Sequence, residues 1–258
     1  KGFEKLLTWT TTLGYPDVRI RFVMEATGVY HQKFAYWLHE QGQDLSIVVP
    51  NKISNYARTL TVKTVTDKSA SEAIFQFGAE RKLDNWEPPK KMYKSLQKLT
   101  RERQQLIDER TVIKNQMHAE RAEADPSEDS MERMRFRIEL LIQQERDIKK
   151  ELAEVFKSDR DLKNNVTLLC TIPGIAELTA ACILGETNGF ELIRNKKQLA
   201  SYAGLDVIEK QSGTSVRGKT RISKRGNRNL RKAMHMPALT ALRSNERYKA
   251  IFVRLVSR

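Results

Sequence analysis

The chain has 258 residues, of which 40% are hydrophobic, and a formal net charge of +14. This length and hydrophobic content predict a globular protein of two or three folding units and exclude an intrinsically disordered chain. The sequence contains no run of ~18 apolar residues that could span a membrane and no recognisable signal peptide, which favours a cytoplasmic protein. The two cysteines, Cys170 and Cys182, lie in apolar surroundings typical of core thiols in a reducing compartment, not of a disulfide or a metal site.

The positive charge is concentrated at the C-terminal end of the chain. Residues 210–258 contain 14 Lys or Arg and a single acid, Glu246, so they carry +13, whereas residues 1–209 carry +1. A localised basic segment favours binding to a polyanion, most commonly a nucleic acid. An anionic membrane surface is the alternative, but no long apolar face accompanies the basic segment.

Alternating strands and helices are predicted for the N-terminal third. Residues 18–24 have the alternation of a strand that ends on Glu25, and residues 46–49 form a second strand. Helices are predicted over residues 31–41 and 51–60. This order predicts an α/β fold with a partly parallel sheet, in which a carboxylate at a strand end is a common place for chemistry. Because the chain begins with Lys instead of Met, we also expect that an N-terminal piece is missing.

Asp67 is the next acidic residue of interest, and it precedes another predicted helix. One interpretation is that Glu25 and Asp67 converge on one Mg²⁺ ion, since carboxylate pairs hold this ion for phosphoryl chemistry. The other interpretation is that Asp67 only caps the helix, with its side chain accepting a backbone N–H. The residues themselves are compatible with both.

Two long helices with a heptad pattern follow the Pro88-Pro89 pair. Apolar residues at heptad spacing run over residues 92–117 and, after a break at residues 124–127, over residues 134–155. Glu145 is a polar interruption of the second seam and could fix its register. The pattern predicts an antiparallel hairpin or a coiled coil between chains, acting as a spacer arm, a dimerisation element or an RNA contact.

Residues 164–184 predict a helix, a Pro-Gly turn and a second helix. Such hairpins present backbone N–H groups to a nucleic-acid phosphate, which makes Gly174 a candidate contact, although an ordinary helical corner has the same pattern. Further helices are predicted over residues 198–205 and 229–243, the latter with a kink at Pro237.

Residues 211–232 form the most basic stretch of the chain and contain no acid. The stretch carries eight basic residues, which are Arg217, Lys219, Arg221, Lys224, Arg225, Arg228, Arg231 and Lys232. This composition suits contacts to phosphates better than a packed core. Ser212, between Gln and Gly, is a candidate nucleophile towards a phosphodiester, and the alternative is a flexible basic loop that only adheres to nucleic acid.

Several motifs occur in a fixed order along nearly the whole chain. They are Glu-Ala-Thr-Gly-Val-Tyr after a strand, Lys-Thr…Asp-Lys, the heptad region, Ile-Pro-Gly-Ile, Tyr-Ala-Gly-Leu, Gln-Ser-Gly, and Ser-Lys-Arg-Gly-Asn-Arg-Asn-Leu-Arg. This ordered set resembles the DEDD-type insertion-sequence transposases, the insertion-sequence one-ten family, which is related to the Piv invertase. The family includes recombinases guided by a bridge RNA.

The resemblance implies an α/β plus α architecture in three parts. Residues 1–87 would form a RuvC/RNase H-like nuclease domain, lacking its N-terminal strand, and residues 88–160 a coiled-coil insertion. Residues 161–258 would form a mostly helical transposase domain with a helix-hairpin-helix-like element. The resemblance further implies a prokaryotic, nucleoid-associated protein.

The resemblance also assigns catalytic roles to three residues of this chain. Glu25 matches the second and Asp67 the third of the family's four metal-binding acids, and Ser212 matches its essential serine. The chain departs from the family in two places. The first acid belongs to a strand that the sequence lacks, and Ala70 stands where the fourth acid is expected, which we interpret as an engineered substitution or a natural loss.

The reaction implied by the resemblance is DNA strand exchange through a covalent intermediate. The acid cluster would bind Mg²⁺, and Ser212 would attack the scissile phosphate. The covalent serine–phosphate bond would conserve the energy of the broken phosphodiester bond, so that the strands can be rejoined. Expected partners are donor and target double-stranded DNA, a guide RNA, and further copies of the chain in a dimer or tetramer held by the coiled coil. The alternatives are a two-metal junction resolvase without a serine intermediate and a catalytically dead form that only binds nucleic acid.

Overall fold

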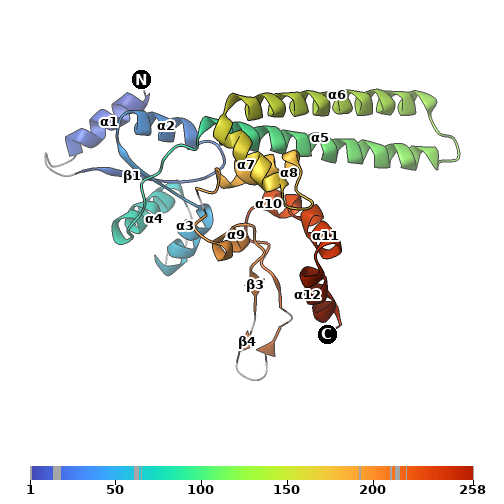
Figure 1. Ribbon diagram of the computed structural model, residues 1–258. Helices are drawn as coiled ribbons and strands as arrows, with labels where there is room; N and C mark the ends of the chain where they lie inside the picture. Colours follow the sequence, from blue (N-terminus) through green and yellow to red (C-terminus); the bar gives the residue numbers. More distant parts are fainter. Residues whose placement is uncertain are drawn as a thin grey trace. The chain divides into compact units, whose positions relative to one another are not determined.

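The computed structural model describes residues 2–13, 19–60, 64, 66–191, 193–209, 211–212, 216–218 and 220–257 (Figure 1). The chain is mostly helical with few strands. It divides into two compact units, Lys1–Pro88 and Pro89–Arg258, with the division at the Pro88-Pro89 pair. Among the described residues, no helix has the length and apolar character that crossing a membrane requires.

The first unit is built around two parallel strands. Strand β1 (Arg21–Glu25) pairs with β2 (Asp44–Val48) in a register that runs from Arg21 opposite Asp44 to Glu25 opposite Val48, and α2 (Gln32–Glu40) connects them. This confirms the predicted strand–helix–strand order and the parallel pairing. The first strand was predicted over residues 18–24 but begins at Arg21, because its partner strand begins only at Asp44. Val18 lies outside the described residues.

Helices pack around this pair of strands. The remaining elements of the unit are α1 (Gly2–Leu13), α3 (Pro50–Ala57), the 3₁₀ turn η1 (Arg58–Leu60) and α4 (Asp67–Glu80). The core holds Ala35, Leu38 and Leu45. Helix α4 lies so close to β1 that a Cβ atom on Gly78 would stand 2.8 Å from Cγ2 of Val23. Glycine is therefore required where this helix crosses the strand.

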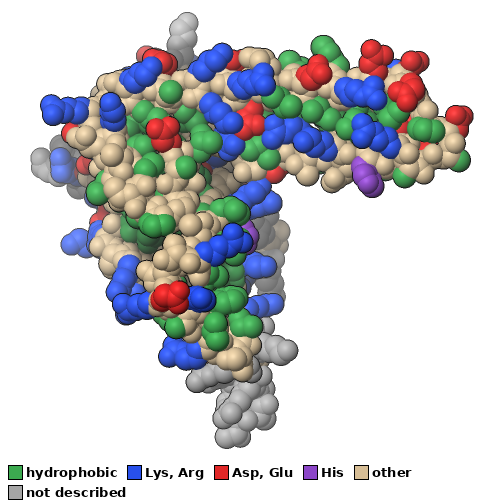
Figure 2. All heavy atoms as spheres, turned by 45° about the vertical axis from the view of Figure 1, so that its right-hand side comes forward, with side chains coloured by type: hydrophobic (Ala, Val, Ile, Leu, Met, Phe, Trp, Pro, Cys, Tyr) green, Lys and Arg blue, Asp and Glu red, His purple; other side chains and the backbone are tan. Residues whose placement is uncertain are grey.

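A long helical hairpin opens the second unit. Helix α5 (Lys91–Arg121) and helix α6 (Glu128–Ser158) pack against each other within the chain, and Ser127 caps α6 by accepting a hydrogen bond from the backbone N–H of Ser130. This confirms the two predicted helices and the break between them, and it favours the intramolecular hairpin over the pairing between chains. Acidic and basic side chains are interspersed along the hairpin surface (Figure 2).

Glu145 lies on the seam of the hairpin, as predicted from its heptad position, and its side chain is only 9% exposed. Its carboxylate accepts hydrogen bonds from Arg103 (2.8 Å) and Arg110 (2.7 Å) of α5, and pairs with Lys149 at 3.1 Å. Burial works to raise the pKa of Glu145, but the hydrogen bonds from Arg110 and Lys149 and the charge of Arg103 lower it to about 2. Because these arginines come from the facing helix, the carboxylate fixes how the two helices align.

Acidification should therefore weaken the hairpin. The pKa of Glu145 falls from an ordinary 4.5 to about 2 on folding, so its stabilising effect is complete above pH ~5 and is lost as the pH falls towards 2. We expect chemical unfolding followed by circular dichroism to show this loss between pH 5 and 3. In Glu145→Gln the stability should depend less steeply on pH, and a variant with the slope of the parent protein would contradict the assignment.

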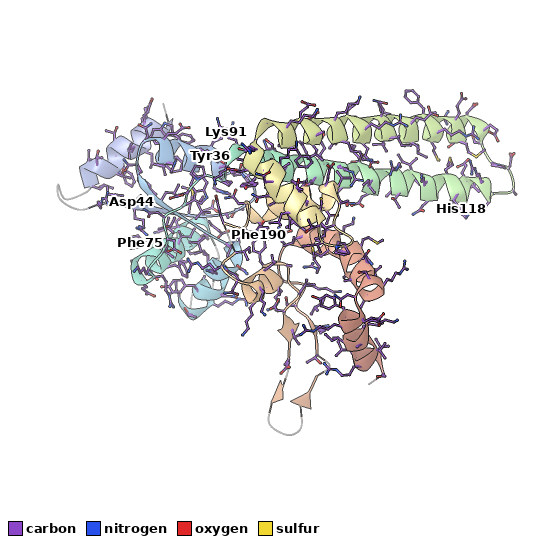
Figure 3. The ribbon with its side chains drawn as sticks, in the orientation of Figure 1. Tyr36, Asp44, Phe75, Lys91, His118 and Phe190 are labelled. Carbon is purple, nitrogen blue, oxygen red and sulfur yellow. The ribbon has the colours of Figure 1, made fainter. Side chains whose placement is uncertain are left out.

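The rest of the second unit is a cluster of helices around α8. The helices are α7 (Arg160–Cys170), α8 (Glu177–Thr187), α9 (Lys196–Tyr202), α10 (Arg228–Ala233), α11 (His235–Ser244) and α12 (Glu246–Val256). Helix α8 packs on α5, α7 and α10 and is buried along most of its length. Phe190, just after α8, packs against this core (Figure 3). The predicted helix–turn–helix is confirmed.

Two features of the C-terminal helices differ from the prediction. The predicted helix over residues 229–243 is interrupted at Met234, three residues before the expected kink at Pro237. Proline has no N–H to bond the carbonyl of Ala233 four residues earlier, so the helix breaks in the preceding turn. Helix α12 was not predicted, and every described residue of it is exposed.

A β-ribbon, which the sequence reading did not predict, joins α9 to α10. Strand β3 (Val207–Ile208) pairs with β6 (Arg221–Ile222), and β4 (Gln211–Ser212) pairs with β5 (Val216–Arg217), both antiparallel. The ribbon projects from the helices of the second unit (Figure 1). It contains the Ser212 position and the first part of the basic stretch.

Candidate functional site

Ser212 lies near the far end of the β-ribbon. Its backbone stands opposite Val216, and the neighbouring residue Gln211 stands opposite Arg217. Nearer to the helices, in the separate pair of β3 and β6, Ile208 stands opposite Arg221, whose side chain is exposed. The backbone of Ser212 therefore lies one position from the Gln211–Arg217 pair, whereas Arg221 lies nearer to the base of the ribbon.

The base of the ribbon is held by hydrogen bonds between its two sides. The backbone N–H of Asn227 donates to the carbonyl of Tyr202 (2.6 Å), that of Lys224 to Gly204 (3.0 Å), and that of Ser223 to Asp206 (2.7 Å). The Ser223 hydroxyl also donates to the Asp206 carboxylate at 2.6 Å.

Glycine is required on each side of this base. Gly204 has a φ of +67°, and a Cβ atom on Gly226 would come within 2.5 Å of the Tyr202 carbonyl oxygen. The Tyr-Ala-Gly-Leu and Arg-Gly-Asn motifs thus form one closely packed joint.

This joint is anchored to a buried carboxylate, Glu186 of α8, whose side chain is fully buried. Arg101 of α5 donates to both carboxylate oxygens, at 2.7 and 2.8 Å. Asn227 (2.6 Å), Asn229 (3.0 Å) and Gln97 (3.3 Å) donate through their side-chain amides. Burial works to raise the pKa of Glu186, but the hydrogen bonds from Arg101 and the asparagines lower it, so the group is a buried carboxylate with a full set of donors.

Glu186 was missed by the sequence reading, although one signal was present. It is an acid at the end of the apolar run of α8, where an ionised side chain requires partners. Its partners Asn227 and Asn229 belong to the Ser-Lys-Arg-Gly-Asn-Arg-Asn motif. Asn227 also caps α10, since its side-chain oxygen accepts from the backbone N–H of Leu230 at 2.9 Å. These two asparagines therefore fix where the basic stretch enters the helix cluster.

The predicted nucleic-acid contacts differ in their surroundings. Lys224, Arg225 and Arg228 are exposed beside the ribbon base, and Lys219 lies outside the described residues. Arg231 is half-buried and donates to the Ala203 carbonyl at 2.6 Å, and Lys232 pairs with Asp108 of α5 at 3.0 Å.

Gly174, another predicted contact, lies in the turn before α8 with a φ of +90°. A Cβ atom there would stand 2.7 Å from Thr240 Cβ and 3.0 Å from the Pro237 backbone, so this turn packs closely on α11.

The predicted acid cluster belongs to the first unit. Glu25 ends β1 and its carboxylate accepts a hydrogen bond from the Thr27 hydroxyl at 2.6 Å. It lines a cavity of about 420 Å³ together with Ser71, Phe75 and other residues of α4. Asp67 does not line this cavity, but it precedes Ser71 by four residues, which is about one helical turn and places both on one face of α4.

The interpretation of Asp67 as a helix cap is wrong. Thr66 caps α4, because its hydroxyl accepts from the Ser69 backbone N–H (3.2 Å) and the Ser69 hydroxyl accepts from the Thr66 backbone N–H (2.8 Å). Asp67 is the first residue of the helix and is exposed. Ala70, in the same turn, is half-buried and brings no oxygen ligand.

Nowhere in the described part of the chain do three or more His, Cys, Asp or Glu side chains gather as metal ligands would.

Comparison with known proteins gives matches over most of the chain. A DEDD-type IS110 transposase model matches residues 1–120, and a model described as "Transposase IS116/IS110/IS902 family" matches residues 166–252. Pilin gene-inverting proteins from Moraxella bovis and Moraxella lacunata are each 30% identical over 239 residues, covering 93% of this chain and 72% of the relative. An uncharacterised 43.6 kDa protein of insertion element IS110 from Streptomyces coelicolor is 35% identical over 78 residues, which is 30% of this chain and 19% of that protein.

Proposed function

Because the chain belongs to the IS110 family of transposases, and hence to a family of DNA transposases and recombinases, we propose that it cuts and rejoins DNA strands with Ser212 as the nucleophile. The observation that carries this proposal is the ribbon. Ser212 lies on a projecting antiparallel pair whose base is tied through Asn227 and Asn229 to the buried Glu186. A nucleophile needs a defined position relative to its phosphate, and this anchored base supports one.

In the proposed reaction the Ser212 hydroxyl oxygen attacks a DNA phosphorus atom. A serine–phosphate bond forms, the bond between phosphorus and the sugar oxygen breaks, and the proton of the serine hydroxyl is transferred to the leaving sugar oxygen. The reverse step, with a hydroxyl of another strand as nucleophile, rejoins DNA and releases the serine. No external energy source is needed, because the phosphodiester is exchanged and not hydrolysed. The exposed Lys224, Arg225 and Arg228 would hold the DNA backbone.

The proposal includes a RuvC-like role for the first unit. Glu25 and Asp67 would be two of the ligands of a Mg²⁺ ion, which when bound supplies charge neutralisation at the scissile phosphate. A carboxylate at position 70 would lie one turn after Asp67 on the same helix, so Ala70 would be the position of a lost ligand.

A guide RNA and an oligomer complete the proposal and rest on the family resemblance. Sequence would be read by pairing between this RNA and DNA, while the protein grips shape and phosphates. Recovery of a structured RNA with the purified chain, whose loops match the joined DNA ends, would support this part. In the proposed dimer or tetramer, further copies of the chain would pack against this intramolecular hairpin.

A covalent adduct tests the serine. We expect the Ala70→Asp variant, given nicked duplex DNA and Mg²⁺, to form a protein–DNA adduct that survives denaturing electrophoresis. The adduct should be absent from Ala70→Asp with Ser212→Ala and present in Ala70→Asp with Ser201→Ala, which removes an exposed serine of α9. Cleavage without an adduct would instead indicate a two-metal resolvase, and DNA binding with neither cleavage nor adduct would contradict the enzymatic proposal.

A further inference from the structure

Helix α12 has an apolar stripe that is exposed to solvent. Its members recur at spacings of three and four residues, so they lie along one side of the helix, and they are Tyr248, Ile251, Phe252 and Leu255. Their side chains are between 38% and 63% exposed. Asn245 caps the helix by accepting hydrogen bonds from the backbone N–H groups of Arg247 and Tyr248. A capped helix with an exposed stripe at this spacing is typical of a surface that packs on another helix.

Positive charge borders the α12 stripe. Arg247 and Arg254 are exposed and lie seven residues apart along one side of it. Lys249, on the other side, pairs with Glu246 at 3.6 Å. If α12 packed on the α12 of a second copy, positive charges would meet along the borders of the contact. The stripe therefore favours a partner helix whose apolar face is bordered by acids.

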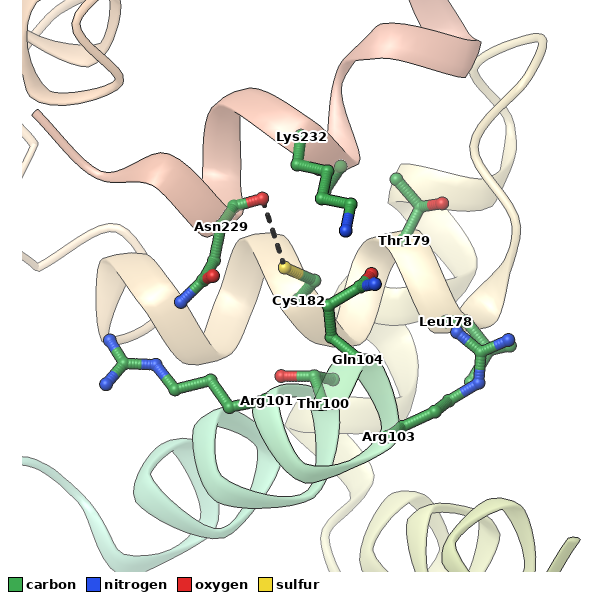
Figure 4. Close-up of a pocket in the computed structure, with 10 residues that line it drawn as sticks. Thr100, Arg101, Arg103, Gln104, Leu178, Thr179, Cys182, Asn229 and Lys232 are labelled. Carbon is green, nitrogen blue, oxygen red and sulfur yellow. Dashed lines mark hydrogen bonds between the residues drawn. The ribbon is translucent and has the colours of Figure 1, made fainter. Parts of the chain in front are cut away.

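The hairpin of α5 and α6 has an inner half that contacts the helix cluster and an outer half that extends beyond it. In the inner half, Gln104 of α5 lines a small cavity together with Thr179 of α8 and Lys232 of α10 (Figure 4). Further along α5, Arg110 bonds Glu145 of α6 at 2.7 Å. The residues of α6 that precede Glu145 therefore belong to the outer half, where the hairpin projects from the cluster (Figure 1).

This outer half has an exposed apolar pair on the side of α6 that is turned away from α5. Phe136 stands two residues from the seam positions Met134 and Ile138, which places it on the opposite side of the helix, and Leu140 follows it one turn later. The side chains of Phe136 and Leu140 are 68% and 50% exposed. Two large apolar side chains this exposed on one helix face indicate a contact surface.

Acidic residues border the Phe136–Leu140 pair. Glu132 and Glu139 are exposed and lie seven residues apart along one side of it, which is the spacing of the two arginines beside the α12 stripe. Arg133 and Arg137 lie along the other side. Residues 120–132, at the end of the hairpin, hold six acids and one base, and acidic side chains are visible there in Figure 2. The charges on this face of α6 are therefore complementary to those beside the α12 stripe.

We propose that the α12 stripe of one copy packs on Phe136 and Leu140 of α6 in a second copy, with the two arginines beside Glu132 and Glu139. The apolar side chains supply the buried surface, and the charges at its border select the partner and the orientation. In a twofold dimer the contact forms twice, since each copy has both faces. The inference rests on the oligomer of the proposed function and names the faces that hold it together.

Charge reversal on either face tests this contact, with sedimentation equilibrium of the intact, nuclease-treated chain as the measurement. Glu132→Lys with Glu139→Lys, and separately Arg247→Glu with Arg254→Glu, should each weaken self-association by about tenfold or more, because like charges then meet. An equimolar mixture of the two double variants should recover the association of the parent chain. In that mixture both contacts of a dimer with one copy of each variant join opposite charges.

Matched variants separate this contact from general effects of charge and surface polarity. Glu102→Lys with Glu109→Lys reverses two exposed acids of α5 at the same spacing of seven and should leave the association unchanged. Phe252→Ser should weaken the association about thirtyfold, as the loss of an aromatic anchor does. Leu168→Ser, at a 68% exposed position of α7, should have no effect.

The possible outcomes distinguish this contact from the rest of the proposed function. If the parent chain and both double variants associate equally, the contact is overturned and the oligomer of the proposed function stands. A monomeric parent chain, or a mixture that associates no better than its components, would also overturn the contact. If the arginine variant loses DNA or RNA binding while its self-association is unchanged, nucleic acid and not a second copy occupies the α12 stripe. Ser212→Ala should associate as the parent chain does, so the serine is tested independently.

Discussion

Replacing Glu186 by alanine should lower the free energy of unfolding of the second unit by about 3–5 kcal/mol, the range measured when one partner of a buried ion pair is removed. The carboxylate is fully buried and is the acceptor for Arg101, Gln97, Asn227 and Asn229. Without it, a guanidinium and three amides lose their acceptor in a low-dielectric region.

Activity should fall beyond what the loss of stability explains. Measured well below the unfolding temperature, Glu186→Ala should reduce strand cleavage more than DNA binding, because the asparagines set the base of the ribbon. Glu186→Gln, which keeps the shape but not the charge, should have an intermediate stability. Glu191→Ala is the matched control. This exposed acid pairs with Lys90 at the surface, so its removal should cost below about 1 kcal/mol. Equal effects of the two alanine substitutions would contradict the anchoring role.

A valine at Gly185 should destabilise the same unit by about 2–3 kcal/mol, through overpacking. A Cβ atom there would stand 2.6 Å from the backbone nitrogen of Gln97 and 3.1 Å from the carbonyl carbon of Leu96. Backbone atoms of α5 cannot rotate away as a side chain can, so α5 and α8 would have to separate. That separation would also draw Arg101 away from Glu186, the next residue of α8.

Thermal unfolding measures this prediction directly. Gly2→Val serves as the control, since a Cβ atom at Gly2 of α1 meets no atom within 4 Å. The control should unfold within about 2 °C of the parent chain, whereas Gly185→Val should lose about 4–12 °C. An unchanged midpoint for Gly185→Val would mean that α5 and α8 approach less closely than described.

The long helices could be predicted from the sequence because their signal is periodic and local. Heptad spacing alone placed α5 and α6, and the position of Glu145 within that pattern placed it on the seam. The Pro-Gly turn between α7 and α8 was equally clear. The parallel strand pair followed from the alternation of strands and helices, although its ends depended on the partner strand.

The β-ribbon and the Glu186 site could not be predicted in this way. Each strand of the ribbon has two residues, too few for an alternating pattern to be recognised. Glu186 is joined to Arg101 and Asn227, which are 85 and 41 positions away in the sequence, so only the fold reveals that they meet. The basic stretch appeared as a uniform run, but Arg231 and Lys232 bond protein groups while Arg225 and Arg228 are exposed.

The roles of the catalytic candidates could only be inferred by resemblance. Glu25 and Asp67 belong to the first unit and Ser212 to the second. Local patterns identified the strand end and the helix start, but they contain no information on whether acids and serine act on one phosphate.

The cap of α4 makes Asp67 suitable for a clean separation-of-function experiment. Since Thr66 and Ser69 satisfy the start of the helix, Asp67→Asn removes a charge while leaving the capping hydrogen bonds intact. The remaining cost is the favourable interaction of an acid with the helix N-terminus, about 0.3–1 kcal/mol. A chain with this substitution should fold normally, so any loss of the proposed magnesium-dependent strand cleavage would report on chemistry. Thr66→Ala is the converse variant, because it removes the cap and weakens α4 while leaving the Asp67 carboxylate unchanged.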